Sequence, residues 1–464
     1  KFEEKTMDHF SPSAACAEFA ADLSYDSIPP EALDLIRRDI LDWTGCALAG
    51  SRDRAAVPIQ KTAELLGGKA EASVFGNRDK TDLRTAAMEN GYFGHIFEMD
   101  DVDRESISHP ATVVMPGAMA LGEWQKKTGR EVLTAIVAGF EVMLRIGAAI
   151  TPAHYAIWHT TSTAGVFGAA AASGRMLGLT NQQMQWALGN AGTLACGLWQ
   201  FNPDGAMSKF LHAGNAAGNG ILVSLMAQNG FSGATHILEG KQGFFAGYAR
   251  QSVNFDLFRD FGRVWRSASV SFKPYPCCRH THSAIDAALS IREQLTRHPG
   301  DPIRHLTVHT YGTALSIAGK TAPATGRDAK FSISYCVAST ILRGTPVEAS
   351  FAADAVSDPA VSGLLSCTDV IDDPSLDAMV PKNWPCRIEA ELGSGEILTA
   401  QVKAPKGDPE NRVSWEECEM KFRTMTLDIL DDAQVKAIVD LAKHFDDIPD
   451  FSRENPFLIA NRNL

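Results

Sequence analysis

The chain has 464 residues, of which 45% are hydrophobic and 21% charged, and its formal net charge is −12. This composition is typical of a globular protein with enough apolar material for two domains. The negative charge opposes binding to phosphate backbones and to anionic membranes, so we predict no nucleic-acid partner and no membrane partner. It does not oppose an anionic small molecule, because a local group of Lys, Arg and His side chains can still form a positive pocket.

Cysteine usage and the apolar stretches indicate the compartment. The nine cysteines are odd in number and form no CxxC pair, which is typical of reduced thiols rather than of a disulfide framework. The most apolar long stretch, 132–150, contains Glu141 and Arg145 and does not read as a membrane span. No secretory signal is visible at the start, so we expect a cytoplasmic protein.

The first 260 residues have a helical pattern. Pro30 opens a segment in which apolar residues recur every three or four positions, and Thr180 with Gln183 forms a capping-box pattern at another helix start. The stretches 164–174 and 213–220 consist almost entirely of small residues, which predicts buried helices that pack closely.

The pattern changes near residue 300. Alternating residues predict a strand over 303–311 and a hairpin formed by 387–392 and 397–402, with helical segments between the strands and again after Pro405. We therefore predict a mainly α fold with an α+β part, and a ligand cleft at the domain boundary. The predicted domains are a large all-helical domain from 8–268 and 405–464, and a smaller α+β lid domain over 269–404.

Four polar segments carry the residue types that acid–base chemistry needs. The first, 98–105, is rich in carboxylates and is followed by His109. Crowded carboxylates raise one another's pKa in a buried site, and a neighbouring histidine can act as a general base. A solvated acidic loop is the alternative, and we favour it for Asp103 and Glu105.

The second and third segments each adjoin a small-residue helix. His159 is followed by Thr160 and three more hydroxyl residues at a helix start, where free N–H groups attract an anion. A simple helix cap by the hydroxyl residues is the alternative. Lys209 precedes the other small-residue helix, where a cation needs an anionic partner, either a substrate carboxylate or a structural Asp.

The fourth segment contains Lys273, Cys277, Cys278, Arg279, His280 and His282. Cysteine and histidine are zinc ligands, but adjacent cysteines do not readily direct both thiolates at one ion, and no second CxxC or HxxxH pair completes the set. We therefore predict no metal, and an anion-binding and proton-transfer group instead. A zinc-dependent hydrolase built on these Cys and His residues is the alternative. The chain also lacks GxSxG, Walker and strand-linked GxGxxG motifs.

Together these motifs resemble the MmgE/PrpD family, which includes 2-methylcitrate dehydratases, cis-aconitate decarboxylases and an iminodisuccinate epimerase. The likeness extends over nearly the whole chain, and its motifs are specific in combination although each is weak alone. It is carried by Leu41-Asp42, Gly45 and Ala49-Gly50; by Asn90-Gly91, His95, Asp100-Asp101 and His109-Pro110; by Trp158 to Thr163; by Lys209 and His212-Ala213-Gly214; by Lys273 and Tyr275-Pro276-Cys277-Cys278; and by Phe331-Ser332-Ile333-Ser334-Tyr335.

The resemblance implies a helical domain, an α+β lid, a cleft between them that uses no cofactor, and a homodimer. The chain departs from many members at Glu98, where Asp is common, and at Val102, where a hydroxyl residue is common, which leaves the particular substrate open. By motif position the catalytic residues fall on Asp100, His109, His159, Lys209, Lys273 and Tyr335, and we add Asp101, Thr160, Arg279 and His282 as substrate-binding residues.

The implied function is that of a cofactor-free lyase of the dehydratase type, acting on a small di- or tricarboxylic acid such as a 2-methylcitrate-like substrate. Such a reaction forms a carbanion next to a carboxylate, whose charge Lys209 and Lys273 would stabilise while His159 and His109 exchange protons in an order left open. Tyr335 would donate a hydrogen bond or a proton. An iminodisuccinate-like epimerase and a cis-aconitate-type decarboxylase are the alternatives within the family. Outside the family, a further alternative is an inactive scaffold that binds partners.

Overall fold

The computed structural model describes residues 10–77 and 79–463, so the predicted domain start at residue 8 lies outside the described residues. The chain divides into two compact units. Unit 1 is helical, whereas unit 2 combines helices with a small sheet, which confirms the predicted mainly α class with an α+β part. Unit 1 comprises Lys1–Ile96, Glu105–Val270 and Trp415–Leu464, and unit 2 comprises Phe97–Arg104 and Ser271–Ser414.

The segment Phe97–Arg104 belongs to unit 2, whereas the predicted domain ranges place it in the helical domain. Its main chain explains the difference, because Val102 and Ser271 exchange two N–H···O=C hydrogen bonds of 2.8 Å. Arg104 adds an ion pair with Asp408, at 3.0 Å between Nη1 and Oδ2. A stretch with no strand pattern of its own is thus bound to the rest of unit 2 by an isolated β-bridge and by ion pairs.

Local start signals set the helices of unit 1. α2 (Pro30–Arg52) begins at the predicted proline, and α9 (Asn181–Thr193) begins with the predicted Thr180–Gln183 capping box. The remaining helices are α1 (Pro12–Asp22), α3 (Val57–Leu66), α4 (Leu83–Gly94), α5 (Ala111–Gln125), α6 (Gly129–Ile150), α7 (Thr160–Thr163), α8 (Gly165–Leu177), α10 (Phe201–Asp204), α11 (Ser208–Gln228), α12 (Phe244–Tyr248), α20 (Trp415–Thr426), α21 (Asp432–Lys443) and α22 (Pro456–Ala460).

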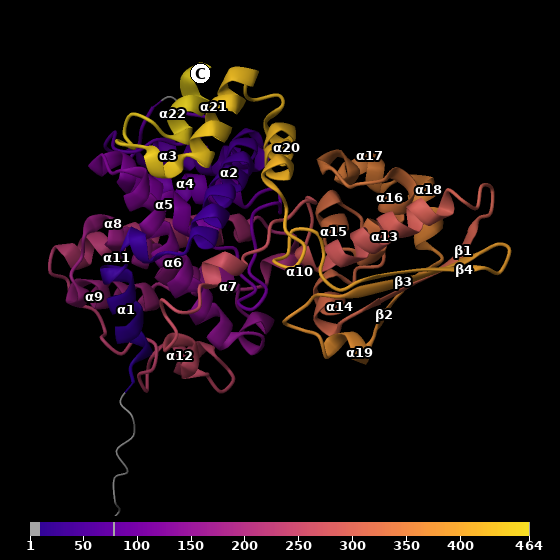
Figure 1. Cartoon of the computed structure of the whole chain (residues 1–464), viewed down its shortest axis with the longest axis horizontal. Coiled ribbons are helices and arrows are strands. Elements are labelled where there is room, and N and C mark those ends of the chain that lie inside the picture. Colours follow the sequence, from indigo (N-terminus) through magenta and orange to yellow (C-terminus); the bar gives the residue numbers. More distant parts are fainter. Residues whose placement is uncertain (1–9, 78, 464) are drawn as a thin grey trace, which may run out of the picture. The chain divides into compact units, whose positions relative to one another are not determined.

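The small-residue helices α8 and α11 are central and buried, as predicted. A Cβ placed on Gly220 of α11 would lie 2.4 Å from the Cβ of Ala169 in α8, so the two backbones approach closely only because one residue is glycine. α4 also packs against α11, and the C-terminal helices α20 and α21 pack against α2 (Figure 1). The histidines of unit 1 that lie in or next to these helices are therefore held in place by close packing.

Helix α6 is long and apolar enough to cross a membrane by length and composition alone, and 94% of its most apolar 18-residue window is buried inside the protein. Within it, the fully buried Arg145 pairs with the fully buried Glu141 and also, at 2.9 Å, with Asp260. Glu141 in turn accepts the main-chain N–H of Ser267 at 2.7 Å. A buried charge pair with partners on other segments is typical of a core helix.

Unit 2 contains a four-stranded sheet of order β2-β1-β3-β4. The predicted strands are confirmed as β1 (Ile303–Thr310), β3 (Cys386–Leu392) and β4 (Ile397–Val402), and β3 pairs antiparallel with both neighbours. The sequence did not predict β2 (Thr368–Asp372), which pairs parallel with β1 and is largely exposed, so it carries no apolar alternation. The helices of this unit are α13 (His282–Leu295), α14 (Gly312–Ala318), α15 (Gly326–Lys330), α16 (Ile333–Arg343), α17 (Ala353–Val356), α18 (Pro359–Leu365) and α19 (Pro374–Asp377).

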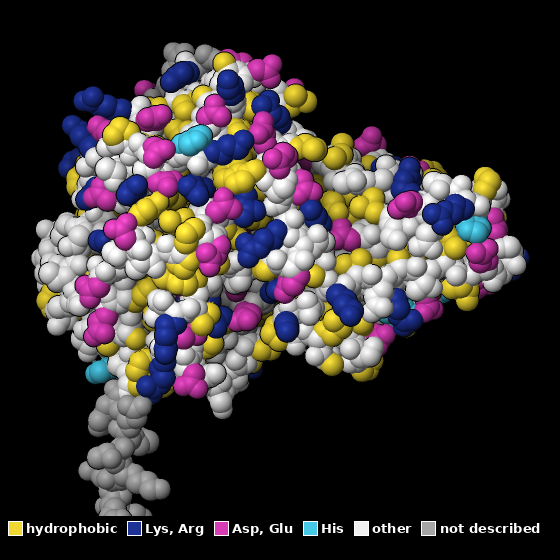
Figure 2. All heavy atoms as spheres, viewed as in Figure 1, with side chains coloured by type: hydrophobic (Ala, Val, Ile, Leu, Met, Phe, Trp, Pro, Cys, Tyr) yellow, Lys and Arg dark blue, Asp and Glu magenta, His cyan; other side chains and the backbone are white. Residues whose placement is uncertain are grey.

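Charged side chains of both signs are interspersed on the face of the molecule drawn in Figure 2. No continuous field of Lys and Arg covers that face. The absence of a nucleic-acid partner stays a prediction from net charge.

Candidate active site

Four histidine side chains of unit 1 lie close together. His95 follows the end of α4, His109 precedes α5, His159 is the N-cap of α7, and His212 lies in the first turns of α11. The ring centroids of His95 and His109 are 4.8 Å apart, those of His95 and His159 are 5.7 Å apart, and those of His159 and His212 are 5.4 Å apart. Both histidines predicted to exchange protons, His109 and His159, thus belong to one cluster.

His159 has the most informative environment of the four. The residue is 1% exposed, and its main-chain N–H donates to the carbonyl oxygen of Gly197 at 3.0 Å. Its Nδ1 lies 3.2 Å from Nδ1 of His212. Its Nε2 is buried and has no hydrogen-bond partner among the residues that the structure describes. A buried, unpartnered polar atom is costly in a finished fold and indicates a place for a ligand atom.

The contact with His212 couples the tautomers of the two rings. Only one of the facing Nδ1 atoms can carry the hydrogen that the other accepts. If His159 donates, its Nε2 holds a lone pair and can act as a base. If His212 donates, the same Nε2 carries the hydrogen and can act as an acid. One ring is therefore equipped for either direction of proton transfer.

The electrostatics keep these rings neutral. Burial lowers the pKa of His159 well below its usual range, and Lys209 and the neighbouring histidines lower it further. Burial, with His95 and Lys209, also lowers the pKa of His212 to about 4. Neutral imidazoles at pH 7 are the form in which a histidine accepts a proton.

Lys209 and Thr160 complete the group in unit 1. Lys209 is 3% exposed and lies three residues before His212 on α11, a spacing that places both side chains on one face of the helix. Thr160 is fully buried, and its Oγ1 has no hydrogen-bond partner among the described residues. Thr161 acts structurally, because its Oγ1 accepts the main-chain N–H of His109 at 3.2 Å. The hydroxyl run, for which a simple cap of the small-residue helix was the alternative interpretation, forms the separate short helix α7.

A second cluster lies in unit 2, around Lys273. Its Nζ is 3.4 Å from Oδ1 of Asp100 and 3.8 Å from Oε2 of Glu98, and Lys273 and Asp100 are fully buried. Glu98 has φ +62, a left-handed conformation that strains a residue with a Cβ. Asp101 is fully buried in the same unit. The predicted catalytic groups Asp100 and Lys273 are therefore partners of one buried ion pair.

Arg279 and His282 belong to a network centred on Asp408. The Asp408 carboxylate is fully buried and accepts hydrogen bonds from Arg279 at 2.5 Å, from Arg104 at 3.0 Å and from Ser271 at 2.8 Å. Arg279 also donates to Nδ1 of His282 at 2.8 Å. Because an arginine can only donate, that nitrogen accepts, and the Nε2–H of His282 is left to donate to the carbonyl oxygen of Cys277 at 3.3 Å. These contacts hold the segment around Lys273, and the substrate-binding role of Arg279 and His282 stays a prediction.

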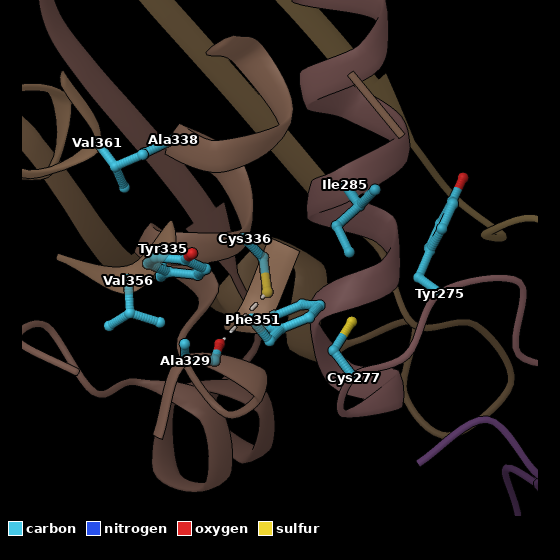
Figure 3. Close-up of a cluster of buried hydrophobic side chains, with 10 residues drawn as sticks. All are labelled: Tyr275, Cys277, Ile285, Ala329, Tyr335, Cys336, Ala338, Phe351, Val356 and Val361. Carbon is cyan, nitrogen blue, oxygen red and sulfur yellow. Dashed lines mark hydrogen bonds between the residues drawn. The ribbon is translucent and has the colours of Figure 1, made fainter. Parts of the chain in front are cut away.

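Tyr335 lies in the hydrophobic core of unit 2, where Figure 3 shows it close to Val356 and Ala329. The residue is fully buried, and its hydroxyl donates to the carbonyl oxygen of Ser350 at 2.5 Å. This hydrogen bond uses the phenolic hydrogen, and the oxygen can still accept a hydrogen bond. The catalytic role predicted for Tyr335 stays a prediction.

The residues whose ligand atoms lie close enough to hold a metal ion are not those of the zinc alternative. Among residues 10–77 and 79–463, the ligand atoms that converge are those of His95, His109 and His159, all within 4.8 Å of one another. In the 273–282 segment, Cys277 Sγ lies 3.1 Å from Oγ1 of Thr281, and the His280 ring stacks on Trp384. The Cys and His residues of that segment form no such ligand group.

Sequence reasoning gave no site role to three residues that the structure places here: His95, His212 and Asp408. The spacing of His212 from Lys209 on one helix is a signal that could have identified it. Asp408 follows a strand hairpin in a loop, and nothing in its local sequence distinguishes it from a solvated carboxylate.

Comparisons with known proteins found two family models that match the chain. The MmgE/PrpD N-terminal domain model matches residues 14–256, and the MmgE/PrpD C-terminal domain model matches residues 275–446.

Similar proteins include cis-aconitate decarboxylases from Aspergillus terreus (28% identical, covering 95% of this chain and 94% of the relative) and Homo sapiens (27% identical, 90% and 88%). A 2-methylcitrate dehydratase from Salmonella typhimurium is 23% identical, with 77% of each chain covered. Since the first domain model alone spans more than half of the 464 residues, the chain belongs to the MmgE/PrpD family.

Proposed function

We propose that the protein is a lyase that moves a proton on the carbon next to a carboxylate of a small di- or tricarboxylic acid, using its own side chains and no metal or cofactor. The observation that carries the proposal is the fully buried His159, whose Nε2 has no hydrogen-bond partner among the described residues and whose ring stays neutral beside Lys209. A neutral base next to a cation suits a substrate that is an anion and becomes more negative as it loses a proton.

The chemistry follows from that arrangement. His159 removes the proton from the carbon next to a carboxylate, and the electron pair of the broken C–H bond is stabilised by the nearby ammonium group of Lys209. In a dehydration, the pair then forms the double bond as the β-hydroxyl departs. That hydroxyl must leave as water, so a second acid protonates it. His109, in the same cluster, is the proposed acid, and the unpartnered hydroxyl of Thr160 is the proposed hydrogen-bond donor to the substrate.

Decarboxylation is the second candidate, and the relatives support it. The relatives named cis-aconitate decarboxylase cover more of the chain at a higher identity than the one named 2-methylcitrate dehydratase. Loss of CO2 from an unsaturated acid also leaves an electron pair that a proton must quench, so the same histidines would serve as the proton donor. Both reactions therefore need the proton transfer proposed here.

The test is to incubate the enzyme in D2O with citrate-, aconitate- and aspartate-like acids and to follow the substrate by NMR. We expect deuterium in a C–H bond next to a carboxylate, even where net turnover is slow. Release of CO2 identifies a decarboxylase, and loss of the β-hydroxyl identifies a dehydratase. If no acid takes up deuterium or turns over, the proposal fails.

A further inference from the structure

We propose that His95, His109 and His159 also form a binding site for one divalent transition-metal ion of the zinc class, and that the bound ion blocks proton transfer. The ligand nitrogens of the three rings lie within 4.8 Å of one another. The residues are 0%, 8% and 1% exposed, so a bound ion would be shielded from bulk water. The site needs no residue of unit 2.

The geometry requires only a small adjustment. A tetrahedral zinc ion with bonds of about 2.0–2.1 Å to nitrogen brings its ligand atoms to within about 3.4 Å of one another. The rings can close this difference by rotating about the soft torsion between Cβ and the ring. Their main chains are fixed, because the three residues lie at the ends of the packed helices α4, α5 and α7.

The contact behind His159 favours a metal at its other nitrogen. A histidine ligand usually donates its second ring N–H to a fixed acceptor, which sets the tautomer and points the free lone pair at the metal. Nδ1 of His159 faces Nδ1 of His212 at 3.2 Å, which supplies that acceptor, and Nε2 is the atom left over. Three imidazoles select zinc, copper, nickel or cobalt over magnesium and calcium, which require oxygen ligands.

Lys209 opposes the binding of a cation. Its side chain is buried, and its charge acts on His159. The site therefore binds its ion weakly and reversibly, as an inhibitor rather than as a resident cofactor. This explains how a group of three histidines can belong to an enzyme whose proposed turnover needs no metal.

The bound ion would block proton transfer because it uses the lone pair that proton transfer needs. A metal ion bonded to Nε2 of His159 occupies the electron pair that would accept the substrate proton. This part of the inference rests on the proposed function, whereas the binding of the ion does not.

The test is a titration of the full chain with Co2+, followed by its visible absorption, and with Zn2+ in competition with a chromophoric chelator. We expect one ion per chain, with the intense visible bands of tetrahedral Co2+. H109N and H159N should each weaken binding at least about tenfold, because each removes one of three ligands. H236N changes an exposed histidine outside the cluster and should leave binding unchanged.

K209M gives a second measurement that keeps all three ligands. Removing the like charge should tighten Zn2+ binding by at least about threefold. The site is overturned if no ion binds at millimolar concentration, if H109N and H159N bind as the parent does, or if K209M binds no more tightly. If Zn2+ binds as expected but deuterium exchange continues at the same rate, the blocking role is wrong. Failure of deuterium exchange in the metal-free enzyme would instead contradict the proposed function and leave the binding site intact.

Discussion

Nζ of Lys273 lies 3.4 Å from Oδ1 of Asp100, and neither side chain is exposed to solvent. Glu98 is a more distant second carboxylate, at 3.8 Å. Removing one partner from a buried ion pair is far more costly than the pair's net contribution, because the remaining charge stays buried. The stability of unit 2 should therefore depend more on the carboxylate of Asp100 than on that of Glu98.

We expect Asp100→Asn to lower the free energy of unfolding by about 3 kcal/mol, because it leaves Lys273 with its more distant carboxylate. Glu98→Gln is the matched control and should cost at most about 1 kcal/mol, because Asp100 remains in place. Chemical denaturation of both variants gives the comparison. Equal losses would show that the closer contact does not dominate.

The buried carboxylate of Asp408 joins two arginines, Arg104 and Arg279, to the hydroxyl of Ser271, two residues before Lys273. Asp408→Asn should lower the free energy of unfolding by about 3–5 kcal/mol, because it leaves two guanidinium groups without their shared charge. Glu410→Gln removes the exposed partner of Arg104 and should cost no more than about 1 kcal/mol. A loss at Glu410 as large as that at Asp408 would contradict this ranking.

Gly50 of α2 packs against the end of α4. A Cβ at this position would lie 2.1 Å from the carbonyl oxygen of Phe93, two residues before His95. Gly50→Ala should therefore lower the free energy of unfolding by about 1–3 kcal/mol or more, since a backbone atom has to move. Gly247→Ala, in α12 and with no atom within 4 Å, should raise it by up to about 1 kcal/mol. Thermal unfolding compares the two, and similar effects would rule out the close contact.

The helices were predictable because their signals are local. Pro30, the Thr180–Gln183 capping box and the small-residue runs each specify a helix or its burial within a few positions of the chain. Strand β2 was not predictable, because an exposed parallel strand has neither apolar alternation nor a hairpin turn. The place of the segment Phe97–Arg104 in unit 2 was not predictable for a similar reason, because it depends on contacts with residues more than a hundred positions away.

Residue types and motif positions were sufficient to predict part of the candidate site. His109, His159, Lys209, Asp100 and Lys273 lie in two buried clusters. Tyr335 lies in the hydrophobic core of unit 2, and the role that motif position implies for it stays a prediction. The ring contacts of His95 and His212 could not be derived, because they depend on how separate helices pack.

His280 makes the stability of unit 2 dependent on pH. Burial, with Arg279 beside it, lowers the pKa of His280 to about 3. Between the pKa of about 6.5 in the unfolded chain and that low value, only the unfolded chain takes up the proton. The free energy of unfolding therefore falls as pH falls through this window, by about 1.4 kcal/mol per pH unit for one such group.

His280→Gln should make this fall less steep between pH 6 and pH 4, even if the variant is less stable at pH 7. Denaturation at several pH values measures the slope, and His444→Gln, at an exposed position, is the control that should leave it unchanged. An unchanged slope in His280→Gln would contradict the assignment.

His159 and His154 are both buried histidines, but they differ in one respect. Both ring nitrogens of His154 are occupied, Nδ1 with the carbonyl oxygen of Tyr248 at 2.9 Å and Nε2 with Oγ1 of Thr163 at 2.7 Å. Nε2 of His159 has no partner among the described residues. If that atom transfers the proton, His159→Ala should lower kcat at least ~100-fold.

His154→Gln should instead lower stability and leave kcat within about threefold, because a structural hydrogen bond is worth about 1 kcal/mol and carries no chemistry. Steady-state rates and deuterium exchange on the same substrate distinguish the two variants. A loss under threefold in His159→Ala would exclude His159 as the proton-transfer group. Equal losses in both variants would mean that the packing of buried rings, rather than the unpartnered nitrogen, sets the rate.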